Sequence, residues 1–110
     1  MQQPVRTRHS PISVYARIRP HQHDMPDVAL LSEKRLQVRN LEFSLDHAFS
    51  EDATQKEVYD IVCRQAASQV LQGLSVCVLA YGQTGSGKTH TMLGSDGVMS
   101  GTGSPEHMGI

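Results

Sequence analysis

The sequence is poor in the bulky residues that fill a large hydrophobic core. It has no tryptophan, only 5% of its residues are aromatic, and its apolar content of 38% is below the usual range. A chain of 110 residues is at most one small domain or part of a larger one. We therefore expect a thin core.

Cysteines, net charge and long apolar runs are scarce as well, and each scarcity excludes a class of protein. Cys63 and Cys77 fall in an expected helix and an expected strand, which favours two buried apolar residues of a reducing compartment over a disulfide framework. A net charge of −1 provides no broad attraction to nucleic acid or to a membrane surface. No apolar run approaches transmembrane length, and the polar N-terminus does not resemble a signal peptide. We expect a cytoplasmic protein with neither nucleic acid nor membrane as a partner.

Glycine, by contrast, is concentrated where it is informative. Residues 82–89 read GQTGSGKT and fit G-x-x-x-x-G-K-[ST], the pattern typical of the phosphate-binding loop (P-loop) of nucleoside triphosphatases. Given the chain's composition, chance would produce this pattern roughly 0.003 times per chain. An apolar run at residues 76–80 precedes the loop and a helix-compatible segment at residues 88–93 follows it. This strand–loop–helix order is the context in which the motif forms a site.

The chemistry of phosphate binding explains the residue types in this loop. Gly82, Gly85 and Gly87 permit positive φ and have no Cβ to keep phosphates from the backbone N–H groups. The start of the following helix adds donors and partial positive charge. Lys88 would contact the outer phosphates, and the Thr89 hydroxyl would help to coordinate Mg²⁺. The expected phosphate site comprises Gly82, Gln83, Thr84, Gly85, Ser86, Gly87, Lys88 and Thr89.

The part of the chain before residue 50 predicts a polar start and several strands. Residues 1–11 are expected to be a disordered lead-in. Residues 13–18 alternate between apolar and polar, which predicts a strand that ends at Pro20. Short strand-like pieces follow around residues 29–31 and 36–39, and residues 42–49 predict one more strand that runs into a loop anchored by Phe49.

A helix and a buried strand are predicted next. Thr54 and Glu57 have the spacing of a capping box, and Gly73 is a natural C-cap. Residues 76–80 are apolar on both faces, as in a parallel strand inside a sheet, reached by a right-handed crossover. Residues 94–109 contain five glycines and predict a flexible loop. The apolar stripe expected on the helix comprises Val58, Ile61, Val62, Ala66, Val70 and Leu71.

Taken together, these motifs resemble the opening part of a kinesin motor domain. VYARIRP at residues 14–20 is similar to the first kinesin strand, and FSLDHAF at residues 43–49 resembles the stretch before the first large helix. EVY at residues 57–59 and VLQG at residues 70–73 match the two ends of that helix, and AYGQTGSGKTHTM at residues 80–92 is close to the family's own P-loop. The resemblance covers residues 12–94 and resumes at residues 109–110. It implies an α/β fold of the P-loop NTPase type, kinesin motor-like, with a truncated sheet and flanking helices, in which residues 12–110 form the N-terminal portion of the motor domain.

The resemblance also implies ligands, partners and a location. They are ATP, Mg²⁺ and microtubules, in the cytoplasm and on the cytoskeleton. Arg17, Pro20 and His90 match the positions that hold the adenine, which is consistent with a guanidinium and an imidazole packing on a flat base. The alternative is that Arg17 and Arg19 are solvated ends of an edge strand.

Some features of the family pattern are changed or missing. Leu45 stands where the family has Phe, and Ala48 where it usually has Val, so that this part of the core would fill less volume. The family's γ-phosphate-sensing element, its aspartate–glycine element and its microtubule contacts would all lie beyond residue 110. We therefore expect no catalytic residue here and no ATPase activity from these 110 residues alone. The alternatives are a non-catalytic fragment that at most binds nucleotide, and another kind of P-loop nucleotidase.

Overall fold

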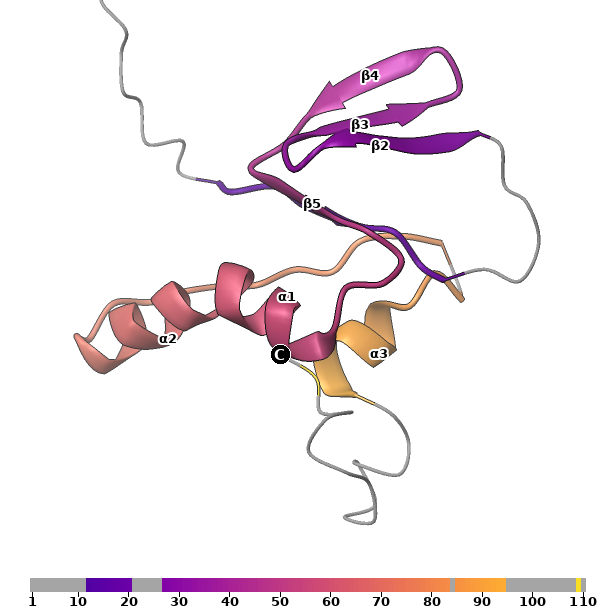
Figure 1. Ribbon diagram of the computed structural model, residues 1–110. Helices are drawn as coiled ribbons and strands as arrows, with labels where there is room; N and C mark the ends of the chain where they lie inside the picture. Colours follow the sequence, from indigo (N-terminus) through magenta and orange to yellow (C-terminus); the bar gives the residue numbers. More distant parts are fainter. Residues whose placement is uncertain (1–11, 21–26, 84, 95–108, 110) are drawn as a thin grey trace, which may run out of the picture.

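The computed structural model describes residues 12–20, 27–83, 85–94 and 109. The expected lead-in, almost all of the loop at 94–109, and Thr84 lie outside these residues. The described part contains two small sheets and three helices (Figure 1). The strands are β1 (Tyr15–Arg17), β2 (Val28–Ser32), β3 (Arg35–Val38), β4 (Leu41–Ser44) and β5 (His47–Phe49), and the helices are α1 (Gln55–Val62), α2 (Arg64–Leu71) and α3 (Lys88–Leu93).

A parallel pair, β1 with β5, lies between the other sheet and the helices (Figure 1). Its register places Tyr15 opposite His47 and Arg17 opposite Phe49, and the Ile18 N–H donates to the Phe49 carbonyl at 3.0 Å. Since parallel strands end at the same edge of a sheet, the chain after Arg17 and the chain after Phe49 leave side by side. The pair is consistent with the α/β class that the sequence predicts.

The stretch at residues 42–49, predicted as one strand, is two strands in different sheets. β4 closes the antiparallel sheet β2–β3–β4, whereas β5 joins the parallel pair. The break falls at Leu45 and Asp46, where the Leu45 N–H donates to the Lys34 carbonyl at 2.8 Å and the Asp46 N–H donates to the Val14 carbonyl at 2.9 Å. The prediction of a continuous strand was wrong because hydrogen bonds to two different partners turn the chain here.

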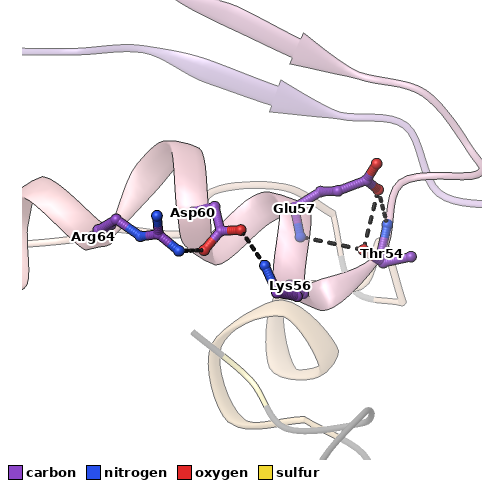
Figure 2. Close-up of polar contacts among 5 residues, drawn as sticks. All are labelled: Thr54, Lys56, Glu57, Asp60 and Arg64. Carbon is purple, nitrogen blue, oxygen red and sulfur yellow. Dashed lines mark hydrogen bonds and ion pairs between the residues drawn. The ribbon is translucent and has the colours of Figure 1, made fainter.

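The N-terminus of α1 is capped as the sequence predicts. The Glu57 N–H donates to the Thr54 hydroxyl at 3.2 Å, and the Thr54 N–H donates to the Glu57 carboxylate at 2.6 Å (Figure 2). On the same helix Asp60 accepts from Lys56 and from Arg64, both at 2.6 Å (Figure 2). These ion pairs are largely exposed, so they contribute little to stability, whereas the reciprocal cap fixes where the helix begins.

The helix expected up to residue 71 is divided in two at Cys63. Cys63 has φ −112° and ψ −20°, but the backbone bonds continue through it, from its N–H to the Tyr59 carbonyl and from the Ala67 N–H to its own carbonyl, both at 2.8 Å. The helical hydrogen bonding is therefore continuous from α1 into α2, and Cys63 is a single distorted residue between them. At the far end, the N–H groups of Gly73 and Leu74 donate to the carbonyls of Val70 and Gln69, and Gly73 has φ +88°. This is a Schellman motif, which confirms the predicted glycine cap.

The predicted strand at residues 76–80 does not form. Among the described residues it pairs with no other strand. Its apolar residues are exposed, Leu79 to 87%, except Val78, which is half-buried. A strand inside a parallel sheet is stabilised by neighbours on both sides, and without a hydrogen-bonded neighbour the apolar sequence remains extended chain. The expected burial of Cys77 is wrong for the same reason, whereas Cys63 is buried.

The core is thin, as the composition predicts. Within the described part of the chain the buried apolar side chains are Ala48, Phe49, Val58 and Cys63. Phe49 anchors the loop into α1, but of the predicted apolar stripe only Val58 is buried, and α2 buries no residue. Most of the apolar stripe is not buried, because no other described helix or strand covers α2. No helix in the described ranges is long and apolar enough to span a bilayer.

Candidate functional site

A cleft of about 750 Å³ opens where three distant segments meet: the end of β1, the entry to α1, and the loop leading into α3. It contains Arg17, Pro20 and His90, which the resemblance to kinesins places in one site, and the P-loop residues Ser86 and Gly87. Its lining residues are Arg17, Arg19, Pro20, Ala53, Thr54, Gln55, Lys56, Ser86, Gly87, His90 and Thr91. Gly82, Gln83, Gly85, Lys88 and Thr89 lie in the same loop and the first turn of α3 without lining the cleft.

The glycine loop needs its glycines for two different reasons. Gly85 and Gly87 have φ +80° and +102°, which side chains rarely tolerate. Gly82 does not have positive φ; a Cβ there would lie 2.5 Å from the Ser86 hydroxyl, so that the Ser86 side chain would have to move. The start of the loop, at Gly82, therefore lies close to Ser86. At its three glycines the backbone is not covered by a side chain of its own.

Two cations hold the carbonyls of this loop. The Lys88 ammonium donates to the Gly82 carbonyl at 2.7 Å, and the Arg19 guanidinium donates to the Gly85 carbonyl. Both positive charges therefore lie against the loop. This combination of glycine backbone and fixed cations suits an anionic group such as a phosphate.

Arg17 is the centre of a hydrogen-bond network on the other side of the cleft. Its guanidinium donates to the Gln55 amide oxygen at 2.6 Å, to the Thr91 hydroxyl at 3.0 Å and to the Ala53 carbonyl at 3.3 Å. Burial lowers the pKa of Arg17, but arginine stays charged at neutral pH. Arg17 is therefore not a solvated strand end. Because N–H donors lie in the guanidinium plane, these bonds do not themselves occupy the faces of the plane, which are the surfaces that an arginine stacks on a flat ring.

Gln55 and Thr91 are members of this network that the sequence does not reveal. Gln55 is the first residue of α1, is 8% exposed, and also donates through its amide nitrogen to the His90 carbonyl at 2.6 Å. The first residue of a helix is usually solvated, so a glutamine there gives no signal of burial. Its partners are 38 and 35 residues away along the chain, where no local pattern could identify them.

The parallel strand pair, the glycine loop entering a helix and the cleft beside them define an α/β fold of the P-loop NTPase type. The family model described as the kinesin motor domain matches residues 3–110. This chain belongs to the kinesin motor domain family, whose members are ATPases that act as microtubule motors.

Curated relatives match most of the chain but are much longer. The kinesin heavy chain of Strongylocentrotus purpuratus is 38% identical over 104 residues, which cover 90% of this chain and 10% of that protein. The kinesin-like protein klpA of Emericella nidulans is 46% identical over 61 residues, covering 56% of this chain and 8% of that protein. The chain thus spans about a tenth of the length of these relatives.

Solved kinesin structures share the fold. The Drosophila kinesin family member Kin10/NOD in complex with divalent manganese and ADP has a TM-score of 0.78 and 33% identity, over 92% of this chain and 34% of that chain. A fast kinesin has a TM-score of 0.79 and 28% identity, over 90% of this chain and 29% of that chain. Drosophila NOD docked with bovine tubulin in a map of its microtubule complex has a TM-score of 0.75 and 32% identity, over 90% of this chain and 33% of that chain.

Proposed function

We propose that this chain forms the nucleotide-binding part of an ATP-driven microtubule motor. The observation that carries the proposal is the cleft that joins Arg17, Pro20 and His90 to the P-loop residues Ser86 and Gly87. Its volume of about 750 Å³ is within the range of small-molecule sites. The cleft offers flat cationic and aromatic groups for a base on one side and glycine backbone for phosphates on the other.

The phosphates and Mg²⁺ are assigned to the loop and the first turn of α3. The glycine backbone, with positive φ at Gly85 and Gly87, fits a phosphate chain, and Lys88 supplies the charge for its outer end. Thr89 is exposed, so its hydroxyl is open to a metal ion that arrives with the phosphates. The manganese and ADP named with NOD support a divalent cation and a nucleotide as ligands.

Arg17, Pro20 and His90 are assigned to the adenine. The three residues lie on the same cleft, and the bonds made by Arg17 in its own plane leave it suited to stack on a base. A kinesin fold matched to NOD docked with tubulin supports microtubules as the partner of the motor, and on that basis we propose a location on the cytoskeleton in the cytoplasm. ATP hydrolysis and movement along microtubules are proposed for a complete motor domain and not for these 110 residues.

The exposed segment at residues 76–80 favours a second candidate function for the 110 residues by themselves. A chain whose central apolar segment is unpaired lacks the rigid sheet on which the loop would otherwise be mounted. Such a chain would bind nucleotide weakly and hydrolyse none.

Titration of this chain, extended to a complete kinesin motor domain, with a non-hydrolysable ATP analogue, with Mg²⁺ and with EDTA, tests the proposal. Mg²⁺ should tighten binding to the wild type, and Thr89→Asn should remove most of that gain. Ser68→Asn, on the exposed surface of α2, is the matched control and should behave like the wild type. A Thr89→Asn protein that keeps the full effect of Mg²⁺ would contradict the assignment of the metal.

A further inference from the structure

We propose that Gln55 is the positioning residue that holds the two base-binding walls of the cleft together. The inference rests on the proposed function, because it concerns the side of the cleft assigned to adenine. Three observations carry it: the burial of Gln55, its two hydrogen bonds, and the identity of the residues at the other ends of those bonds.

The burial of Gln55 requires partners for its amide. Among the described residues it is the one buried polar side chain, at 8% exposure. A buried amide without hydrogen-bond partners would cost on the order of 1–3 kcal/mol of stability. The hydrogen bonds of Gln55 are therefore what allows its side chain to be buried. Those bonds join two separate segments to the start of α1.

In one of the two hydrogen bonds the Gln55 amide is the acceptor, and in the other it is the donor. The Gln55 oxygen accepts from the Arg17 guanidinium and the Gln55 nitrogen donates to the His90 carbonyl, each at 2.6 Å. A primary amide offers an acceptor oxygen and a donor nitrogen on one planar group, which suits it to a donor on one side and a carbonyl on the other. A carboxylate at this position would keep the contact with Arg17 but turn a second oxygen toward the His90 carbonyl.

The partners of Gln55 come from the two walls of the cleft. Arg17 ends β1, and His90 lies in the first turn of α3. The Thr91 hydroxyl accepts a second bond from Arg17 at 3.0 Å, which closes the network. Gln55 thereby sets the separation of the Arg17 and His90 walls, while the contacts of the P-loop through Lys88 and Arg19 are made elsewhere. Its loss should affect the base more than the phosphates.

The experiment compares ATP with inorganic tripolyphosphate as ligands of this chain extended to a complete kinesin motor domain. Gln55→Leu removes both bonds at similar volume, and Gln55→Glu removes only the one to His90. We expect either variant to lose about tenfold in ATP affinity and less than about twofold in tripolyphosphate affinity. Gln65→Leu, on the exposed surface of α2, is the control and should change neither.

The outcomes separate this inference from the proposed function. If the wild type shows no preference for ATP over tripolyphosphate, the adenine assignment fails and the inference fails with it. If the wild type prefers ATP but either Gln55 variant keeps the full preference, the adenine assignment stands and the inference is overturned. An equal loss for both ligands in Gln55→Glu would likewise overturn it, because Gln55 would then act on the fold as a whole.

Discussion

The Arg17 guanidinium donates a 3.0 Å hydrogen bond to the Thr91 hydroxyl, across 74 positions of the chain. The bond ties the end of β1 to α3, the helix that follows the P-loop. The wall of the cleft that carries His90 is therefore linked directly to the wall that carries Arg17 and Pro20. A base held between these walls would lie at one end of the cleft, with the glycine loop at the other.

His90→Ala tests whether this end of the cleft recognises a base. The variant removes a ring that could pack on adenine, while the phosphate contacts of the loop remain. We expect ATP to lose more affinity than tripolyphosphate when both are measured by calorimetric titration. His47→Ala, on β5 and outside the cleft lining, serves as the control. Equal losses for the two ligands in His90→Ala would mean that His90 acts on the phosphates or on folding.

Thr54→Ala tests the cap of α1. Its hydroxyl satisfies the Glu57 N–H, and the loss of such a cap costs about 1 kcal/mol of unfolding free energy. Thr54→Ser keeps the hydroxyl and should remain within a few tenths of a kcal/mol of the wild type. Urea unfolding followed by circular dichroism measures both. Equal stability of the alanine and serine variants would contradict the role given to the hydroxyl.

The same cap predicts a pH dependence. The Thr54 backbone N–H is the main cause that holds the pKa of the Glu57 carboxyl below its ordinary value near 4.5, and the Thr54 hydroxyl adds to the shift. Because the pKa of Glu57 is lower in the folded state, the cap stabilises the protein at every pH above the ordinary pKa of the unfolded chain. This contribution is lost as the pH falls through the pKa of the folded state. An NMR titration of the Glu57 carboxyl carbon should give a midpoint below 4.5. A midpoint at or above that value would contradict the geometry of the cap.

Features that depend on near neighbours could be predicted from the sequence. The capping box joins residues three positions apart, and Gly73 closes a helix through bonds to Val70 and Gln69. The positive φ of Gly85 and Gly87 follows from the loop pattern itself. In each case the physical cause lies within a few residues, so the local pattern is sufficient.

Features that depend on distant partners could not be predicted in the same way. Residues 76–80 have the composition of a buried strand, but a strand requires a hydrogen-bonded neighbour, and among the described strands none pairs with this segment. The turn at Asp46 depends on the Val14 carbonyl 32 positions earlier. Gln55 is buried because Arg17 and His90 meet beside it, and nothing near residue 55 reveals that meeting. The resemblance to kinesins placed Arg17, Pro20 and His90 in one site, whereas their spacing alone would not have.

The 110-residue chain by itself should release no measurable phosphate from ATP, with or without microtubules. Phosphoryl transfer requires a positioned water and charge stabilisation on several sides of the γ-phosphate. Among the described residues, the loop and Lys88 would meet the phosphates from one side. A steady-state phosphate-release assay, with a complete kinesin motor domain as the positive control, measures this directly. Turnover stimulated by microtubules in the purified 110-residue chain would contradict the prediction.

The most direct test of the account uses this chain extended to a complete kinesin motor domain, and measures its affinity for a Mg²⁺-bound, non-hydrolysable ATP analogue before and after Lys88→Ala. Lys88, which bonds the Gly82 carbonyl, would contribute a charge-assisted phosphate contact worth about 1.5–3 kcal/mol. Calorimetry should therefore show a loss of roughly tenfold to a hundredfold. Lys34→Ala, on the exposed turn between β2 and β3, should stay within about twofold of the wild type, since no phosphate contact is assigned to it. Unchanged affinity in Lys88→Ala would contradict the assignment of residues 82–89 as the phosphate-binding loop.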